Sequence, residues 1–163
     1  MAEQDTLNVK VVGPTPTWPT KIHFLVKNYE FTEHTADIGI RVRGDDLKGL
    51  FKNTALAMFD IIAQTSVIKS KREEEITVKE KADNLEELFI NWLNDLLSLS
   101  AAKELIFTNF KIEELGEHNI KAVCSAEDAS NFKFNTEIKA ATYQGLKIEK
   151  IPLGWQAEVI FDV

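Results

Sequence analysis

The sequence predicts an α+β domain in which two amphipathic helices pack on a mostly antiparallel β-sheet. Apolar residues recur at helical spacing in two segments and at alternating positions in most of the others. The segments follow the order strand, helix, strand, helix and then a run of strands joined by short polar turns, which favours antiparallel pairing. With 163 residues, 44% of them hydrophobic, the chain can bury one substantial core.

The first 28 residues have a different character. Three of the four prolines lie within residues 13–19, and proline at this density interrupts both helices and sheets. We therefore predict an extended N-terminal arm over residues 1–28 and a single domain over residues 29–163. Within the arm, residues 7–11 and 22–26 alternate as edge strands or a docking tail would, and both alternatives stay open.

The first predicted helix follows Gly44. Apolar residues spaced three and four apart between positions 47 and 62 mark one face of an amphipathic helix. We expect Asp45 to be the N-cap residue, because its short side chain can accept a hydrogen bond from a free amide of the first turn.

The second predicted helix carries a stronger apolar stripe over residues 85–97. Asn84 and Glu87 have the spacing of a capping box, which indicates where this helix begins. Trp92 lies on the stripe, and we expect it in the core together with the other aromatic residues of both helices.

Segments that alternate between apolar and polar residues predict the strands. Residues 115–119 and 143–145 have the composition of turns between strands, and the mixed-charge run 69–75 is typical of a solvated connector. The expected strands are residues 38–42, 76–78, 107–112, 120–125, 134–140, 146–148 and 155–163.

Composition and charge exclude several classes of function. The formal net charge of -7 disfavours general nucleic-acid binding unless a local basic face exists. No apolar run approaches the roughly 20 residues that span a bilayer, and the acidic N-terminus does not match a secretory signal. The single cysteine, Cys124, excludes an intrachain disulfide. We therefore expect a cytoplasmic protein that has no contact with a membrane.

Short catalytic motifs are missing from the sequence. The seven glycines form no phosphate-binding loop, the three histidines lack HExxH spacing, and one cysteine cannot make a CxxC zinc cluster. There is also no GxSxG nucleophile elbow. We therefore expect a protein without catalytic activity of its own.

Two aspartates at opposite ends of the predicted domain lie beside apolar residues. Asp37 precedes the segment 38–42, and Asp162 lies in the segment 155–163. Burying an unpaired carboxylate is costly, and a shared divalent cation such as calcium or magnesium would satisfy both side chains. The main-chain carboxylate of Val163 is a candidate third ligand. The alternative is that Asp37 caps a turn and Asp162 lies at a solvent-exposed strand end.

Six blocks in the same order and spacing resemble the archease family from about Tyr29 to Val163. Each block alone is weak, but together they cover most of the chain, and only residues 1–28 lie outside them. The blocks are Tyr29–Phe31, His34–Ile38, the helix around Leu50–Phe51, Leu88–Leu97, Ile138–Tyr143 and Val159–Val163.

The resemblance implies an archease-like fold and a function. Archeases are small cytoplasmic protein cofactors of the GTP-dependent RNA ligase that joins tRNA halves bearing a 3′-phosphate and a 5′-hydroxyl. The implied role is to promote guanylylation and multiple turnover of this ligase, with RNA contacted only indirectly or within the ligase complex. A second hypothesis is a chaperone-like or modulatory binding module for other RNA-processing proteins such as methyltransferases.

The resemblance also implies site residues. Asp37 and Asp162 correspond to the metal-binding aspartates of the family, with calcium, magnesium or manganese as the ion, and Lys139 corresponds to its functional lysine. His34 is the imidazole nearest to Asp37 in the sequence and is a candidate hydrogen-bond partner for it, although a bond to the backbone is an equal alternative. Many archeases have a histidine where this chain has Gln144, so any role of that histidine cannot be carried over.

Overall fold

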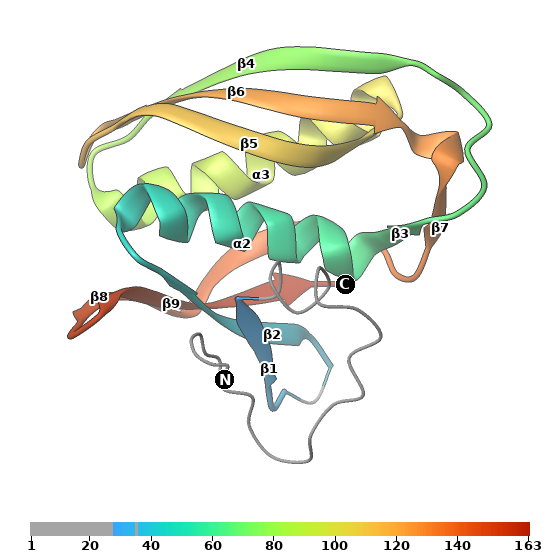
Figure 1. The fold of residues 1–163 in the computed structure, drawn as a ribbon. Helices are drawn as coiled ribbons and strands as arrows, with labels where there is room; N and C mark the ends of the chain where they lie inside the picture. The colour runs from blue at the N-terminus through green and yellow to red at the C-terminus, as the bar shows by residue number, and fades with distance from the viewer. Residues whose placement is uncertain (1–27, 35) are drawn as a thin grey trace, which may run out of the picture.

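The computed structural model describes residues 28–34 and 36–163. It has three layers, with the two helices lying between two antiparallel sheets (Figure 1). The predicted fold class is therefore confirmed, and both helices are covered on two sides. The predicted arm, including segments 7–11 and 22–26, lies outside the described residues except for Asn28.

The two sheets and two helices have the following bounds. The four-stranded sheet has the strand order β1 (Tyr29–Thr32), β2 (Ile38–Gly44), β9 (Gly154–Asp162) and β8 (Ala140–Ile151). The three-stranded sheet has the strand order β4 (Glu73–Lys81), β6 (Asn119–Asp128) and β5 (Leu105–Leu115), and the helices are α2 (Leu47–Ile62) and α3 (Leu85–Lys103).

Helix α2 begins one residue later than predicted. Asp46, not Asp45, is the N-cap residue, and its side chain accepts a hydrogen bond from the Gly49 amide at 2.7 Å. Both aspartates can cap a helix, so the residue pattern could not separate them. The helix contacts β2 below it and β5 above it, and its buried residues therefore cover more than one stripe: Leu50, Phe51, Thr54, Ala55, Ala57, Met58, Phe59, Ile61 and Ile62.

Helix α3 begins where predicted. The Asn84 side chain accepts a hydrogen bond from the Glu87 amide at 2.8 Å, while the Glu87 carboxylate accepts one from the Asp83 amide at 3.0 Å. Trp92 is fully buried, as predicted. Its indole N–H donates to the Phe51 carbonyl of α2 at 3.1 Å, so one side chain fastens the two helices together. No helix in the described part of the chain is long and apolar enough to cross a membrane.

The predicted strand 134–140 is wrong. A short strand, β7 (Phe132–Phe134), ends where this segment begins, and residues 135–139 form a connector that leads into β8. The Asn135 amide donates to the Ile62 carbonyl at 2.8 Å, so the connector is fastened to the end of α2 where it begins, and its last residue, Lys139, donates to the Asp162 carbonyl of β9. Alternation alone therefore did not reveal that residues 135–139 lie outside any strand.

The predicted turn at 143–145 is also wrong, because these residues lie inside β8. Pairing of β8 with β9 changes register between Thr142 and Lys147, and Gly145 has a φ of 65°. A β-bulge uses the same left-handed glycine conformation as many turns, so both give the same sequence pattern. Gln144 is exposed within this irregular stretch. The turn between β8 and β9 lies instead at residues 152–153.

The predicted strand 155–163 corresponds to β9, which begins and ends one residue earlier. The remaining predicted strands are confirmed as parts of longer strands, and the turn within 115–119 joins β5 to β6. Two short strands were not predicted, namely β1 and β3 (Ala63–Thr65), of which β3 pairs with β7. The mixed-charge run 69–75 is only partly a connector, since residues from Glu73 onward belong to β4. Charged side chains are common on an edge strand such as β4, where they oppose unwanted pairing.

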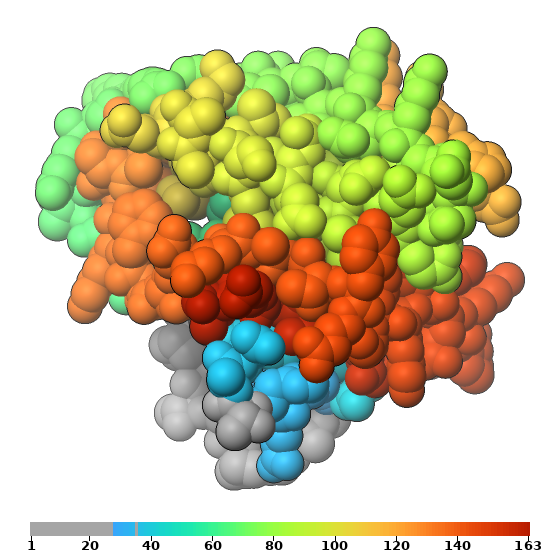
Figure 2. Space-filling view, turned by 180° about the vertical axis from the view of Figure 1, so that it is seen from behind, coloured from blue at the N-terminus to red at the C-terminus, as the bar shows by residue number. Residues whose placement is uncertain are grey.

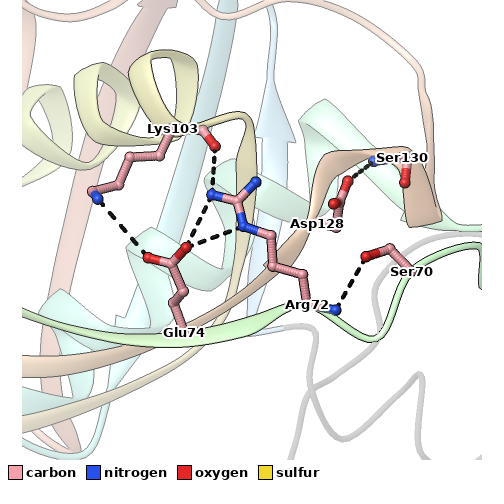
Figure 3. A network of polar contacts seen from close by, with 6 residues as sticks. All are labelled: Ser70, Arg72, Glu74, Lys103, Asp128 and Ser130. Carbon is pink, nitrogen blue, oxygen red and sulfur yellow. Dashed lines mark hydrogen bonds and ion pairs between the residues drawn. The ribbon is translucent and has the colours of Figure 1, made fainter.

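A polar network connects β4, α3 and β6 (Figure 3). Arg72 donates to the Glu74 carboxylate at 2.9 Å and to the Lys103 carbonyl at 3.0 Å. A cation at the last carbonyls of α3 complements the helix dipole. Close by, the Ser130 amide donates to Asp128 at 2.9 Å, and hydrogen bonding from Ser130 is the main cause that holds the Asp128 pKa below its ordinary value.

Three titratable groups lie between α3 and the three-stranded sheet. Burial, a hydrogen bond with Asp95 of α3 and the charge of Asp95 raise the pKa of Glu80 on β4 to about 7. Burial and the charge of Asp95 raise the pKa of Cys124 on β6 to about 12. The Cys124 thiol is free and stays protonated near neutral pH.

We predict that the free energy of unfolding falls as pH rises through the titration of Glu80. Glutamate in the unfolded chain has a pKa of about 4.3, whereas in the fold the pKa of Glu80 is about 7. The protonated side chain therefore contributes its full stability below about pH 4.3, and this contribution is lost as pH rises through about 7. Because Glu80 is partly exposed to solvent, we expect a loss of only about 1 kcal/mol.

Urea unfolding at about pH 5 and about pH 7.5 measures this difference in wild type and in Glu80→Gln. The glutamine variant should lose about 1 kcal/mol less than wild type over the same interval. An equal loss in both proteins would show that another group is responsible.

Candidate functional site

Strands β2, β9 and β8 end side by side at one end of the four-stranded sheet. Ile38 of β2 pairs with Phe161 of β9, and Ala140 of β8 pairs with Asp162. Asp37 precedes Ile38 and therefore lies one position beyond the last β2–β9 pair, next to Asp162. Figure 2 shows the C-terminal residues, in dark red, beside the blue residues that lead into β2. The topology thus brings the two predicted aspartates together.

Asp37 and Asp162 lie at neighbouring positions, and Asp162 is on the sheet face that points away from the helices. Phe161 is buried, so the alternation along β9 places Asp162 on the opposite face, where it is exposed; Asp37 is half-buried. Neither side chain forms a hydrogen bond or ion pair with another described residue. Like charges at facing positions of neighbouring strands are destabilising. A cation between them would therefore stabilise this end of the sheet.

His34 lies over Gly39 of β2. A Cβ atom at Gly39 would overlap the His34 ring and the Thr32 hydroxyl oxygen, so only glycine leaves room for both side chains. Gly39 is two residues from Asp37 along the chain, which places the imidazole near the aspartate pair. Within residues 28–34 and 36–163, His34 has no hydrogen bond to Asp37, and no three His, Cys, Asp or Glu side chains are grouped to hold a metal ion. The role of His34 stays a prediction.

Lys139 and Val163 lie on either side of Asp162. The Lys139 amide donates to the Asp162 carbonyl at 2.8 Å, which fixes the start of β8 against the end of β9. The Lys139 side chain is exposed, and its ammonium forms no ion pair with a carboxylate of the described residues. Val163 packs against the hydrophobic core, and its main-chain carboxylate directly follows Asp162. The backbone of all the predicted site residues except His34 therefore converges on the last pairs of three strands.

Asn94 of α3 holds the edge strand of this site and was not singled out from the sequence. Its side-chain oxygen accepts a hydrogen bond from the Ala141 amide at 2.8 Å, and its side-chain nitrogen donates to the Ala141 carbonyl at 3.2 Å. β8 is an edge strand, so the Asn94 amide takes the place of a neighbouring strand next to Lys139 and Ala140. A polar residue beside the buried Leu93 on an apolar helix was the only sequence signal for this role.

These features define a small α+β protein with an acidic pair at the end of a sheet. The chain belongs to the archease family, because the model of the Archease protein family matches residues 29–163. The resemblance seen in the sequence is therefore confirmed.

Similar proteins and structures agree with this assignment. Protein archease of Methanosarcina acetivorans is 41% identical over 143 residues, covering 84% of this chain and 97% of that protein. Protein archease of Pyrococcus abyssi is 38% identical over 144 residues, covering 85% of this chain and 100% of that protein.

Two solved structures have the same fold. The solution structure of protein 1598 from Methanobacterium thermoautotrophicum has a TM-score of 0.62 at 28% identity and covers 84% of this chain and 99% of its own. The crystal structure of a Thermotoga maritima protein, described as an archease and possible chaperone, has a TM-score of 0.55 at 25% identity and covers 81% of this chain and 94% of its own.

We predict that Asn94→Ala loosens the edge of the candidate site. The substitution removes two hydrogen bonds to Ala141, each worth about 1 kcal/mol, so the free energy of unfolding should fall by about 2 kcal/mol. Hydrogen exchange measured by mass spectrometry should speed up in peptides that cover residues 139–142.

A matched control is Asn53→Ala, because Asn53 of α2 donates to the Arg43 carbonyl at 2.8 Å, at the other end of β2. This variant should lose about 1 kcal/mol and leave the exchange of residues 139–142 unchanged. Equal exchange of residues 139–142 in the two variants would contradict the assigned role of Asn94.

Proposed function

We propose that this protein binds a divalent cation at Asp37 and Asp162 and activates the RNA ligase that rejoins tRNA halves. The observation that supports the proposal most is the juxtaposition of these aspartates where β2 and β9 end. Membership of the archease family favours this ligase as the partner. In this proposal the protein promotes guanylylation and multiple turnover of the ligase in joining 3′-phosphate and 5′-hydroxyl ends, and it has no joining activity of its own.

The donor set suits a hard cation. Two carboxylates at neighbouring strand ends, with main-chain oxygens and water, are the ligands that calcium, magnesium and manganese prefer. The main-chain carboxylate of Val163 is a further candidate ligand, and His34 would act by hydrogen bonding to a carboxylate rather than by binding the ion. When bound, the cation would supply positive charge for contact with a phosphate group.

The placement of the site suits action on a partner protein. Asp162 and Lys139 are both exposed at one end of the sheet, where a second protein can reach them. The Lys139 ammonium could contact a phosphate in the ligase site, and the net charge of -7 suits a partner with a basic RNA-binding surface. In this proposal the protein contacts RNA only within the ligase complex.

A second candidate function is a chaperone-like or modulatory module for other RNA-processing proteins, such as methyltransferases. It is favoured by the description of the Thermotoga maritima relative as a possible chaperone. Affinity capture with the intact protein separates the two functions: recovery of methyltransferases or unrelated clients without an RNA ligase supports the second, and recovery of the ligase supports the first.

We predict that a divalent cation raises the melting temperature of this protein. At a free cation concentration about 100 times the Kd, binding adds about 2.7 kcal/mol, which corresponds to a rise of about 5 to 10 °C for a chain of this size. Thermal scans with calcium, magnesium and manganese measure the effect. Asp37→Asn and Asp162→Asn should abolish it, because each removes one of the two anionic ligands.

Asp45→Asn is the matched control for these scans. Asp45 is exposed and precedes the α2 cap, so its substitution changes the net charge equally and should leave the cation effect intact. A glycine-serine extension after Val163 should weaken cation binding if that carboxylate is a ligand. A cation effect that survives in both Asp37→Asn and Asp162→Asn would place the ion elsewhere.

We predict that the wild-type protein accelerates a cognate tRNA-splicing ligase under multiple turnover and joins no RNA alone. Asp37→Ala and Lys139→Ala should reduce the rate to that of the ligase by itself, because the first removes a cation ligand and the second a phosphate contact. Gel assays of ligated product, with Asp45→Asn as control, report the rate. Failure of the wild-type protein to accelerate any cognate ligase would refute the proposed function.

A further inference from the structure

A groove lined by three lysines lies between the first half of α2 and the edge strand β5. It has a volume of about 400 Å³ and is lined by Lys48, Lys52 and Lys111, with Phe110 and Ile112 among its other lining residues. Figure 1 shows α2 running beside β5 in this region. The groove lies near the end of β2 that leads into α2, whereas the aspartate pair lies at the other end of that strand. It is therefore separate from the candidate site above.

Within residues 28–34 and 36–163, the lysine ammonium groups of this groove have no carboxylate partner. Lys48 donates to the main-chain carbonyl of Glu113 at 3.2 Å and so crosses from α2 to β5. The Glu113 carboxylate lies 3.6 Å from Lys121 instead. None of these three lysines forms an ion pair with a carboxylate of the described residues. Three lysines without a carboxylate partner among the described residues thus line one groove of a protein whose net charge is -7.

The groove offers charge and few other means of recognition. The Gly49 amide at its α2 side already donates to Asp46, so this backbone donor is occupied. Phe110 is only 1% exposed and presents no ring face on which a base could stack. Flexible ammonium groups act as point charges toward phosphate.

We propose that this groove binds the phosphate groups of a phosphorylated ligand, either a free polyphosphate or a few consecutive phosphates of a single RNA strand. Its volume is that of a small-ligand site, so it accommodates two or three phosphates rather than a duplex. The Asn109 side-chain amide also lines the groove. Because the groove has no aromatic face for stacking, we expect the lysines to bind phosphate largely independently of base sequence. The proposal concerns this chain alone, so its failure would leave the proposed ligase activation untouched.

Binding to the full chain tests this proposal without a ligase. Fluorescence anisotropy with a labelled single-stranded RNA of about 12 nucleotides and calorimetry with tripolyphosphate are measured at about 50 mM salt. Lys52→Gln combined with Lys111→Gln should weaken binding about tenfold or more, and for RNA it should lower the salt dependence of log Kd by about 1.4, since each phosphate contact on a single strand contributes about 0.7. Lys48 is kept because it also joins α2 to β5.

The matched control combines Lys79→Gln with Lys81→Gln on the edge strand β4, where both lysines are exposed. This control has the same net charge as the groove variant and should change the affinity less than twofold, and the melting temperatures of both variants should equal that of wild type. If both probes bind and tripolyphosphate displaces the RNA, the groove binds RNA through its phosphates. If tripolyphosphate binds and RNA does not, the groove binds a small phosphorylated ligand. Absence of binding by either probe, equal weakening in control and groove variants, or tighter binding of a glutamate-rich peptide than of both probes would overturn the proposal.

Discussion

The position of β9 between β2 and β8 is the constraint on which the rest of the structure depends. Its pairs with β2 and β8 complete the four-stranded sheet, and its buried residues close one side of the helix pair. The same pairs bring together Asp37, Lys139 and Asp162, which are distant in the sequence. Trp92 fixes the two helices to each other above this sheet. Fold and candidate site are therefore consequences of one strand arrangement.

The register of β9 is specified on both faces of the sheet. On the buried face, a slip of one residue would expose Phe161 and turn Asp162 toward the core, at a cost that excludes it. On the opposite face, Arg41 of β2 lies 3.2 Å from Glu158 of β9 and 3.5 Å from Glu30 of β1. Such partly exposed ion pairs add little stability, but a shifted register would lose them. The aspartate pair can form only in the native register.

The sequence predicted the elements whose signals are local. Helix α3 has an apolar stripe and a cap at Asn84, so the prediction of where it begins was correct. At α2, the adjacent Asp45 and Asp46 have the same capping chemistry, so the prediction fell on Asp45 although Asp46 is the cap. Segment 134–140 alternates like a strand, but its residues 135–139 lie outside any strand, and Gly145 marks a bulge that resembles a turn. In these places, pairing with distant residues decides the structure.

The functional residues also divide into those with a local sequence signal and those that depend on pairing between distant residues. The chemistry of Asp37 and Asp162 suggested a cation, but their proximity follows only from the pairing of β2 with β9. Asn94 acts through a strand that lies far from it in the sequence. In the lysine groove, Lys48 and Lys52 have the spacing of one helix face, whereas Lys111 joins them only because β5 packs beside α2.

The pairing of Ile38 with Phe161 also bears on how the chain folds. Contacts between residues far apart in sequence require closure of a long loop, and proteins rich in such contacts fold slowly. The β5–β6 hairpin and helix α3 require closure of shorter loops, so they can form before β2 pairs with β9. The acidic pair is thus among the last features to assemble, and folding intermediates that lack the β2–β9 pairing do not carry it. Occupation of that pair by a cation would report a fully folded chain.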